Sequence, residues 1–183
     1  MMIERIRREH GYMTRLLVIL RSKLEALQAE ESVNYSLIKE VVDYLCTHSE
    51  AVHHPKEDII YHYYIEKYGN DDSMVNLERE HLELADKTHD FLNIIEMILQ
   101  DAIVPQDLFI KQLEDFIVTQ KQHLDVEERS VLPKIVETFT VNDWRKVESQ
   151  WNKSEADPLF GDTIADRYKQ LAKLVRENSL ECH

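Results

Sequence analysis

Residues that interrupt helices are scarce in this chain of 183 residues, which has only three glycines and four prolines. Glycine and proline are the strongest punctuators of regular structure, so their scarcity leaves room for long helices with few connections. No stretch alternates convincingly between polar and apolar residues, as a half-buried strand would. The sequence therefore predicts an all-α protein.

Cysteines and long apolar runs are also lacking. Cys46 and Cys182 are the two cysteines, too few and too far apart to suggest a disulfide framework. The longest purely aliphatic run, "LLVIL", is far too short to span a bilayer, and the charged start "MMIERIRREH" lacks the apolar core of a signal peptide. We therefore expect a soluble, cytoplasmic protein with reduced thiols and no membrane partner.

Positive charge is in deficit, with 22 basic against 35 acidic residues and a formal net charge of −13. Such a balance argues against nucleic acid or an anionic membrane as a partner. The hydrophobic share of 43% is ordinary, and the chain is long enough for one well-buried domain.

The spacing of apolar residues predicts four long helices. In the first helix, apolar positions from Ile3 to Leu27 recur at alternating intervals of three and four, and His10 occupies one of them. Three further helices are expected at about 36–68 with Gly69 as C-terminal cap, at about 72–101 opened by Asp72 or Ser73, and at about 105–137 with Pro105 in its first turn. Short connections between long helices predict an antiparallel, up-and-down four-helix bundle over residues 1–137.

Residues 138–183 are expected to form a C-terminal helical extension packed on the same domain. Thr140 and Asp143 open a shorter helix that includes Trp144 and Trp151. The stretch "SEADPLFGD" is expected to be a loop, and residues 163–178 a last amphipathic helix.

Several histidines lie four residues before an acidic residue, the spacing that presents both side chains on one face of a helix. About two such pairs are expected by chance, because short motifs have a high false-positive rate. The chain has four: His53/Glu57, His54/Asp58, His62/Glu66 and His123/Glu127. The motif alone is weak evidence. The position of each pair on its helix, and its repetition along the chain, must decide which pairs are candidate ligands.

The stretch "HHPKED" contains two overlapping pairs. Successive α-helical residues turn by about 100°, which places His53 and Glu57 on a largely apolar stripe. The same projection places His54 and Asp58 on an acidic stripe that belongs in water. We therefore expect the first pair to face inward and the second to lie toward the rim, although Pro55 can kink the helix there.

A repeat of two helices is the stronger signal. "REHGYM" around His10 is echoed 71 residues later by "REHLEL" around His81, and "HHPKEDIIY" around His53 is echoed 70 residues later by "HLDVEERSVLP" around His123. Pairing the two halves brings four imidazoles and two carboxylates together inside the bundle. The candidate metal ligands are His10, His53, Glu57, His81, His123 and Glu127.

Burying several ionisable groups in an apolar core is costly unless they are paired or bind a metal. Imidazole and carboxylate ligands without thiolate suit iron, manganese or zinc. Two carboxylates for four imidazoles suggest two metals with each glutamate bridging. We expect His10 and His53 to bind one metal and His81 and His123 to bind the other.

Taken together, "EH" at His10, "HHPKED", "REH" at His81 and "HLDVEE" followed by "VLP" resemble the hemerythrin-like family over residues 1–137. The resemblance implies two non-haem iron ions per chain, with a bridging oxide or hydroxide, in a four-helix bundle. It also implies chemistry with dioxygen or nitric oxide in sensing, redox reactions or iron handling. The expected partner is a small diatomic ligand or an anion.

The sequence departs from the family's pattern at one place. Oxygen-carrying members have two histidines one turn apart on the third helix, whereas Leu77 and Ala85 flank His81 at that spacing. A fifth histidine is therefore missing, which argues against plain oxygen carriage. The iron–sulfur-repair branch has an extra N-terminal domain with paired cysteines, and this chain starts directly at the first helix.

Two alternatives stay open. Ferritin-like di-iron oxidases use Glu-x-x-His on two helices, a spacing found at Glu50/His53 and Glu78/His81, although on consecutive helices. A metal-free helical interaction module is the other. Of the remaining candidates, Glu9 and Glu80 are expected to be solvated, Tyr64 to pack in the core, and His48, His62, His89 and His183 to be incidental.

Overall fold

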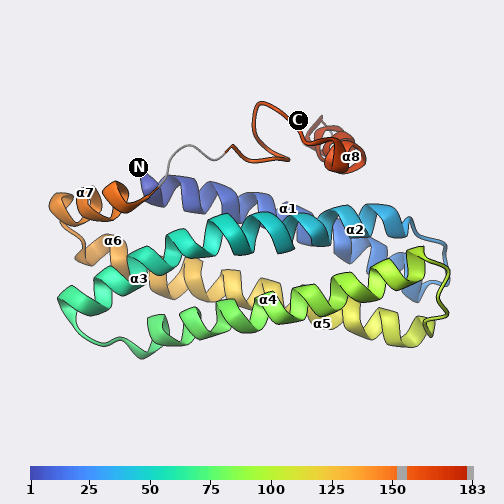
Figure 1. The fold of residues 1–183 in the computed structure, drawn as a ribbon, viewed down its shortest axis with the longest axis horizontal. Coiled ribbons are helices and arrows are strands. Elements are labelled where there is room, and N and C mark those ends of the chain that lie inside the picture. Colours follow the sequence, from blue (N-terminus) through green and yellow to red (C-terminus); the bar gives the residue numbers. More distant parts are fainter. Residues whose placement is uncertain (152–155, 181–183) are drawn as a thin grey trace.

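The computed structural model describes residues 1–151 and 156–180, and every regular element in this part of the chain is a helix (Figure 1). The expectation of an all-α protein is confirmed. None of the helices in the described ranges is both long enough and apolar enough to cross a bilayer.

Four long helical spans lie side by side along the length of the molecule (Figure 1). The first is α1 (Met2–Gln28) and the third is α4 (Asp72–Leu99). The second joins α2 (Tyr35–Tyr44), the π-helix η1 (Leu45–His53) and α3 (His54–Tyr68). The fourth joins α5 (Gln106–Val126), the π-helix η2 (Glu127–Val131) and α6 (Leu132–Thr138).

Both π-helices end two residues before a proline, η1 before Pro55 and η2 before Pro133. Proline has no N–H to donate, and in an α-helix its ring clashes with the carbonyl four residues earlier. A turn with i→i+5 hydrogen bonds is wider and moves that carbonyl away from the ring. Each span therefore continues past its proline, at the cost of a changed helical register.

The helix ends follow the expected capping chemistry with two corrections. Pro105, expected in the first turn of the fourth span, is the N-cap residue that precedes α5. Gly69 ends α3 with a φ of 100°, the left-handed conformation that glycine adopts without steric cost. The predicted cap of the third span at Asp72 or Ser73 is wrong, because the Asp71 carboxylate accepts hydrogen bonds from the backbone N–H groups of Ser73 and Met74. Asp71, Asp72 and Ser73 all have side chains that can cap a helix, and in the structure Asp71 is the N-cap residue.

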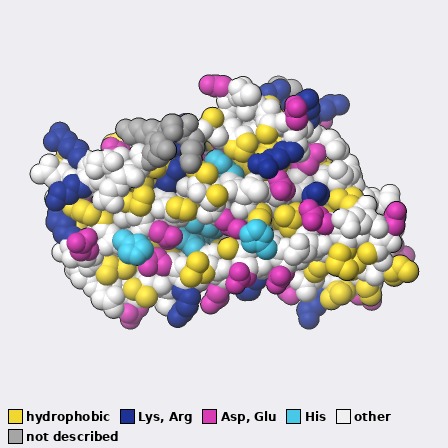
Figure 2. All heavy atoms as spheres, viewed as in Figure 1, with side chains coloured by type: hydrophobic (Ala, Val, Ile, Leu, Met, Phe, Trp, Pro, Cys, Tyr) yellow, Lys and Arg dark blue, Asp and Glu magenta, His cyan; other side chains and the backbone are white. Residues whose placement is uncertain are grey.

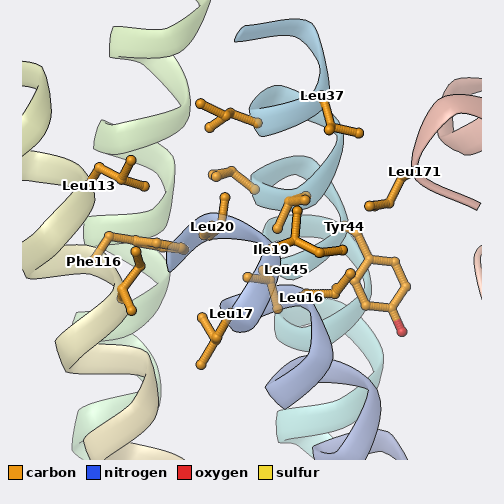
Figure 3. Packing of buried hydrophobic residues seen from close by; sticks show 14 of the residues in the cluster. Leu16, Leu17, Ile19, Leu20, Leu37, Tyr44, Leu45, Leu113, Phe116 and Leu171 are labelled. Atoms are coloured by element: carbon orange, nitrogen blue, oxygen red, sulfur yellow. The ribbon is translucent and has the colours of Figure 1, made fainter. Parts of the chain in front are cut away.

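Two apolar clusters leave a polar band between them. One gathers around Leu16, Leu20 and Phe116, in the half of the bundle that contains the connection between α4 and α5. Figure 3 shows side chains of this cluster from several helices packed together. The other gathers around Ile6 and Ile135 at the opposite end. All the predicted apolar positions of α1 from Ile3 to Leu27 are buried, as expected from their spacing.

The C-terminal region begins with α7 (Val141–Gln150), which Thr140 and Asp143 open through a reciprocal capping box, as predicted. Trp151 follows this helix and is not part of it. The last helix, α8 (Lys169–Leu180), begins later than predicted, after the 3₁₀ turn η3 (Asp166–Tyr168). The first two residues of the expected loop, 154–155, lie outside the described residues.

The described part of this region packs on the second span. Asp157 accepts a hydrogen bond from the Tyr44 hydroxyl at 2.8 Å, and the Tyr168 hydroxyl donates to the Asp43 carboxylate at 2.8 Å. The Phe160 ring stacks on the Tyr12 ring of α1 with centroids 4.0 Å apart. Through Asp157, Phe160 and Tyr168, these contacts hold the C-terminal region against α2 and α1.

Candidate metal centre

The polar band between the apolar clusters contains all six side chains that the sequence analysis selected as ligands, and all six are buried. His53, Glu57 and Glu127 have no solvent-exposed surface. Figure 2 shows that some histidine and acidic side chains also reach the surface on one face of the molecule. So many buried ionisable groups require partners, because an isolated buried charge is strongly unfavourable.

Glu57 lies between imidazoles from three helical spans. Its Oε1 atom is 2.9 Å from His10 Nε2 and 3.3 Å from His53 Nε2, whereas its Oε2 atom is 3.6 Å from His81 Nε2. The two oxygens thus face different imidazoles. This is the arrangement that a carboxylate bridging two cations requires.

Glu127 occupies the equivalent place from the fourth span. Its Oε2 atom is 3.4 Å from both His10 Nε2 and His123 Nε2. Its Oε1 atom is 3.5 Å from His81 Nε2 and accepts a hydrogen bond from the Tyr61 hydroxyl at 2.7 Å. Sequence reasoning missed Tyr61, which shares the stripe of His54 and is fully buried.

Five of the candidate ligand atoms are buried and have no hydrogen-bond partner among the described residues. They are the Nε2 atoms of His53, His81 and His123 and the Oε2 atoms of Glu57 and Glu127. Buried polar atoms almost always have partners, because an unpaired one costs about 1–3 kcal/mol. Since nitrogen and oxygen atoms of this kind are the usual ligands of transition metals, the residues present fit a bound cation.

The opposite nitrogen of each imidazole contacts a carboxylate. The Nδ1–carboxylate distances are 2.7 Å for His10–Glu128, 2.6 Å for His53–Glu9, 2.8 Å for His81–Asp58 and 3.3 Å for His123–Glu80. Such partners hold the ring proton on Nδ1, orient the ring and leave Nε2 free to bind metal. In all four rings, Nε2 is therefore the nitrogen that remains available to bind a metal.

Glu9 is not solvated as predicted, because only 3% of its surface is exposed. Besides contacting His53, it accepts a hydrogen bond from Arg5 Nε at 2.9 Å. Burial raises the pKa of Glu9, but hydrogen bonding and attraction to His53 outweigh it and hold the pKa at about 2. Glu80, its counterpart on α4, keeps a side chain that is 44% exposed, in line with the prediction.

His54 does not lie toward the rim as predicted, and this is the main correction at the site. Its ring is buried and stacks on His81 with centroids 4.2 Å apart and planes 5° from parallel. The projection at about 100° per residue failed because η1 precedes His54, and a π-turn contains more residues than the 3.6 of an α-turn. After that change of register, both adjacent histidines reach the polar band.

The candidate ligand atoms form two groups, each with its members within 4.8 Å of one another. One contains His10, His53 and Glu57, and the other contains His54, Glu57, His81 and His123. Glu57 belongs to both groups, so the geometry offers two neighbouring cation positions that share a carboxylate. The second position has three imidazoles and the first has two.

In the metal-free protein the surroundings shift the pKa values of these imidazoles in different directions. Burial lowers the pKa of His10, but hydrogen bonds to Glu128 and Glu57 outweigh it and raise the pKa to about 10. Burial likewise lowers the pKa of His81, but Asp58 and Glu127 raise it to about 10. For His54, burial and the nearby His81 both lower the pKa well below its usual value. A cation must displace the protons from His10 and His81 to bind.

The ferritin-like pairing is not assembled in this structure. Glu50 contacts His89 at 3.2 Å and Glu78 contacts His62 at 3.0 Å, so neither glutamate faces the polar band. Tyr64 packs in the core, as predicted.

Of the histidines expected to be incidental, His62 and His89 are largely exposed, whereas His48 is buried 3.4 Å from Asp157. His183 lies outside the described residues.

A protein-family model described as the hemerythrin HHE cation binding domain matches residues 1–135. Searches of curated proteins and of solved structures found no significant match. The matched stretch contains both groups of candidate ligand atoms and ends close to the C-terminus of α6.

Proposed function

Because the chain belongs to the hemerythrin HHE cation-binding family, we propose that it binds two non-haem iron ions per chain in this polar band. His10 and His53 hold the first ion, and His54, His81 and His123 hold the second. Glu57, which belongs to both ligand groups, and Glu127, whose oxygens lie 3.4 Å from His10 and His123 and 3.5 Å from His81, would supply carboxylate ligands to the pair. The observation that carries the proposal is the set of five buried ligand atoms without hydrogen-bond partners in the described residues.

The proposal includes the architecture and domain division expected from the sequence. Residues 1–137 form an up-and-down antiparallel bundle, and residues 138–183 form an extension on the same domain. The short connections of residues 69–71 and 100–105 between successive spans support antiparallel neighbours. The internal repeat supports pairing of the two halves about the polar band.

Iron is the proposed metal because imidazole and carboxylate ligands without thiolate suit it, and because the resemblance noted in the sequence points to a di-iron centre. When bound, the iron pair supplies redox and ligand-binding chemistry toward dioxygen or nitric oxide. The chain's own residues orient the imidazoles through four outer carboxylates. The apolar clusters on either side exclude water from the band.

His54 changes the expected ligand count. The sequence analysis found a fifth histidine missing from the third helical span, and His54 supplies a fifth imidazole from the second span. The first position then has one imidazole fewer than the second, so it is the position at which an external ligand would bind. With a fifth imidazole at the centre, reversible binding of dioxygen joins sensing and iron handling among the candidate roles.

Tyr61 is the proton-bearing group nearest to the bridging carboxylates. Its hydroxyl donates to Glu127 Oε1 at 2.7 Å. Burial and then the charge of Glu127 raise its pKa well above the usual value, so the hydroxyl stays protonated. Tyr61 therefore fixes the orientation of Glu127 and holds a proton at the edge of the centre.

Metal stoichiometry tests the proposal first. Protein without a histidine tag is reconstituted anaerobically with ferrous ion, and iron is quantified per chain. We expect saturation at two irons. Saturation at one iron would contradict a dinuclear centre, and no uptake would favour the metal-free module.

Optical spectra then test for an open position. Azide added to the ferric protein should produce a new charge-transfer band, and nitric oxide added to the reduced protein should change its spectrum. An unchanged spectrum with both ligands would show a closed, structural centre. With dioxygen, a stable and reversible adduct indicates carriage, whereas direct oxidation indicates a sensing or redox role.

A further inference from the structure

A second cluster of potential ligands lies outside the polar band, between η1 and α4. Cys46 and Glu50 are on η1, and His89 is on α4. The cysteine is buried and the glutamate side chain is only 13% exposed, whereas the His89 side chain is 61% exposed. The cluster therefore reaches from the interior to the surface, where a dissolved ion can approach it.

Three potential donor atoms of the cluster lie close together, and Cys46 Sγ lies beside both ring nitrogens of His89, 3.3 Å from Nδ1. The distances are 3.5 Å from Cys46 Sγ to His89 Nε2, 3.2 Å from His89 Nε2 to Glu50 Oε2, and 3.9 Å from Cys46 Sγ to Glu50 Oε2. Tetrahedral zinc with a Zn–S bond of about 2.3 Å and Zn–N and Zn–O bonds of about 2.0–2.1 Å requires donors about 3.3–3.6 Å apart. Because Sγ lies beside both ring nitrogens, the largely exposed His89 ring must rotate to direct Nε2 at a cation shared with Cys46 and Glu50.

The cluster also contains an unpaired buried atom. Glu50 Oε1 is buried and has no hydrogen-bond partner among the described residues. Burial raises the pKa of Glu50 to about 7, and burial together with Glu50 raises the pKa of the Cys46 thiol to about 12. Without a compensating positive charge, this pocket disfavours both anions. A divalent cation would stabilise the thiolate and the carboxylate together.

We propose that Cys46, Glu50 and His89 form a mononuclear site for a divalent cation of the zinc type, separate from the iron centre. A ligand set of one thiolate, one imidazole and one carboxylate suits zinc or cobalt better than it suits iron. Three protein ligands leave a fourth position, which faces solvent on the side of His89. The site does not depend on which metal occupies the polar band.

The location ties this site to the elements that carry the iron ligands. η1 continues from Cys46 and Glu50 to His53, and α4 carries both His81 and His89. A cation at the second site would join η1 to α4 outside the iron centre, adding to the contacts that already hold these elements together.

Cobalt(II) is the probe that distinguishes the two sites. The full chain carries a Cys182→Ser substitution so that Cys46 is the remaining thiol, and it is titrated with Co²⁺ after iron loading. We expect one cobalt per chain with a thiolate-to-cobalt charge-transfer band in the near ultraviolet. Iron content should stay constant, and added Zn²⁺ should abolish the band. The iron ligands contain no thiolate, so cobalt in the polar band cannot produce this signal.

Variants assign the other two ligands. His89→Ala changes an exposed side chain that folding tolerates, and Glu50→Gln preserves size; each should abolish the band at cobalt concentrations that saturate the parent protein. His62→Ala, on the exposed face of α3, is the matched control and should leave the band unchanged. Absence of the band in the parent protein would overturn the proposal. So would a band that survives both variants, or cobalt uptake that occurs only as iron is released.

Discussion

The two halves of the repeat, residues 1–70 and 71–140, build nearly the same set of contacts from different residues. Each half supplies an imidazole from its first helix, a His-x-x-x-Glu pair from its second, and a π-helix followed by a proline. The corresponding residues are His10 and His81, Glu9 and Glu80, His53 and His123, Glu57 and Glu127, and Asp58 and Glu128. The correspondence thus extends to the carboxylates that orient the rings.

The halves differ at one decisive position. His54 in the first half corresponds to Leu124 in the second; His54 lies in the polar band, whereas Leu124 packs in the apolar core. The π-helices are also placed differently, because η1 ends at His53 whereas η2 begins at Glu127. A duplicated unit therefore provides two similar cation positions. His54 and the different placement of the two π-helices give these positions different numbers of imidazoles.

The largest expected effect comes from the carboxylate that belongs to both ligand groups. Glu57→Gln should reduce iron from two per chain to almost none, because a neutral amide replaces the carboxylate that faces His10, His53 and His81. Iron quantitation after anaerobic loading is the measurement. Glu66→Gln, at an exposed position on α3, is the control. Retention of one iron would show that Glu57 serves a single position.

The next effect tests the asymmetry directly. His54→Leu gives the first half the residue that the second half has at Leu124, and it should weaken iron binding at the second position, so that a chelator removes that iron more readily. The first position keeps His10 and His53, whereas the second loses one of three imidazoles. His62→Leu should retain both irons. Unchanged resistance of both irons to the chelator in His54→Leu would show that His54 fills space beside His81 without binding metal.

A smaller effect is expected from the matched outer carboxylates. Asp58→Asn and Glu128→Gln each remove the charge next to one ring, at His81 and His10 respectively. Loss of such a partner weakens metal binding by about 10–100-fold, so competition with a chelator should show similar losses for both. A loss confined to one variant would mean that the two halves do not act as equivalents.

The smallest effect concerns pH. In the iron-free protein, His10 and His81 have pKa values raised to about 10, above the usual value of about 6.5. Their folded-state protonation therefore contributes stability that is fully present below about pH 6.5 and is lost as pH rises through 10. Iron binding requires the opposite, deprotonated state, so iron should be held at neutral pH and released toward about pH 5.

Thermal denaturation across this range provides the measurement. The midpoint of the iron-free protein should fall between pH 7 and 10, while the stabilisation added by iron should grow over the same interval. Parallel pH trends for the two forms would show that the imidazoles do not exchange protons for metal.

Much of the fold could be read from local patterns. The apolar spacing of α1, the glycine after α3 and the capping box of α7 act within a few residues, so they give the positions of helices without knowledge of their neighbours. The repeat likewise predicted the candidate ligands. Its two matching His-x-x-x-Glu pairs lie on the inward faces of the second and fourth spans. These predictions needed only the 3.6-residue period of an α-helix.

The places of His54, Tyr61 and Glu9 depended on more than that period. A π-helix before Pro55 changed the register and turned His54 and Tyr61 inward, although an α-helical projection places both on a solvated stripe. Glu9 is buried because His53 approaches from another span and its imidazole compensates the carboxylate charge. The sequence by itself determined which helices form and which histidines recur, since those follow from local periodicity. Only the tertiary structure decided the fifth imidazole and the outer carboxylates, because register after a π-turn and contacts between distant helices are not encoded in any local pattern.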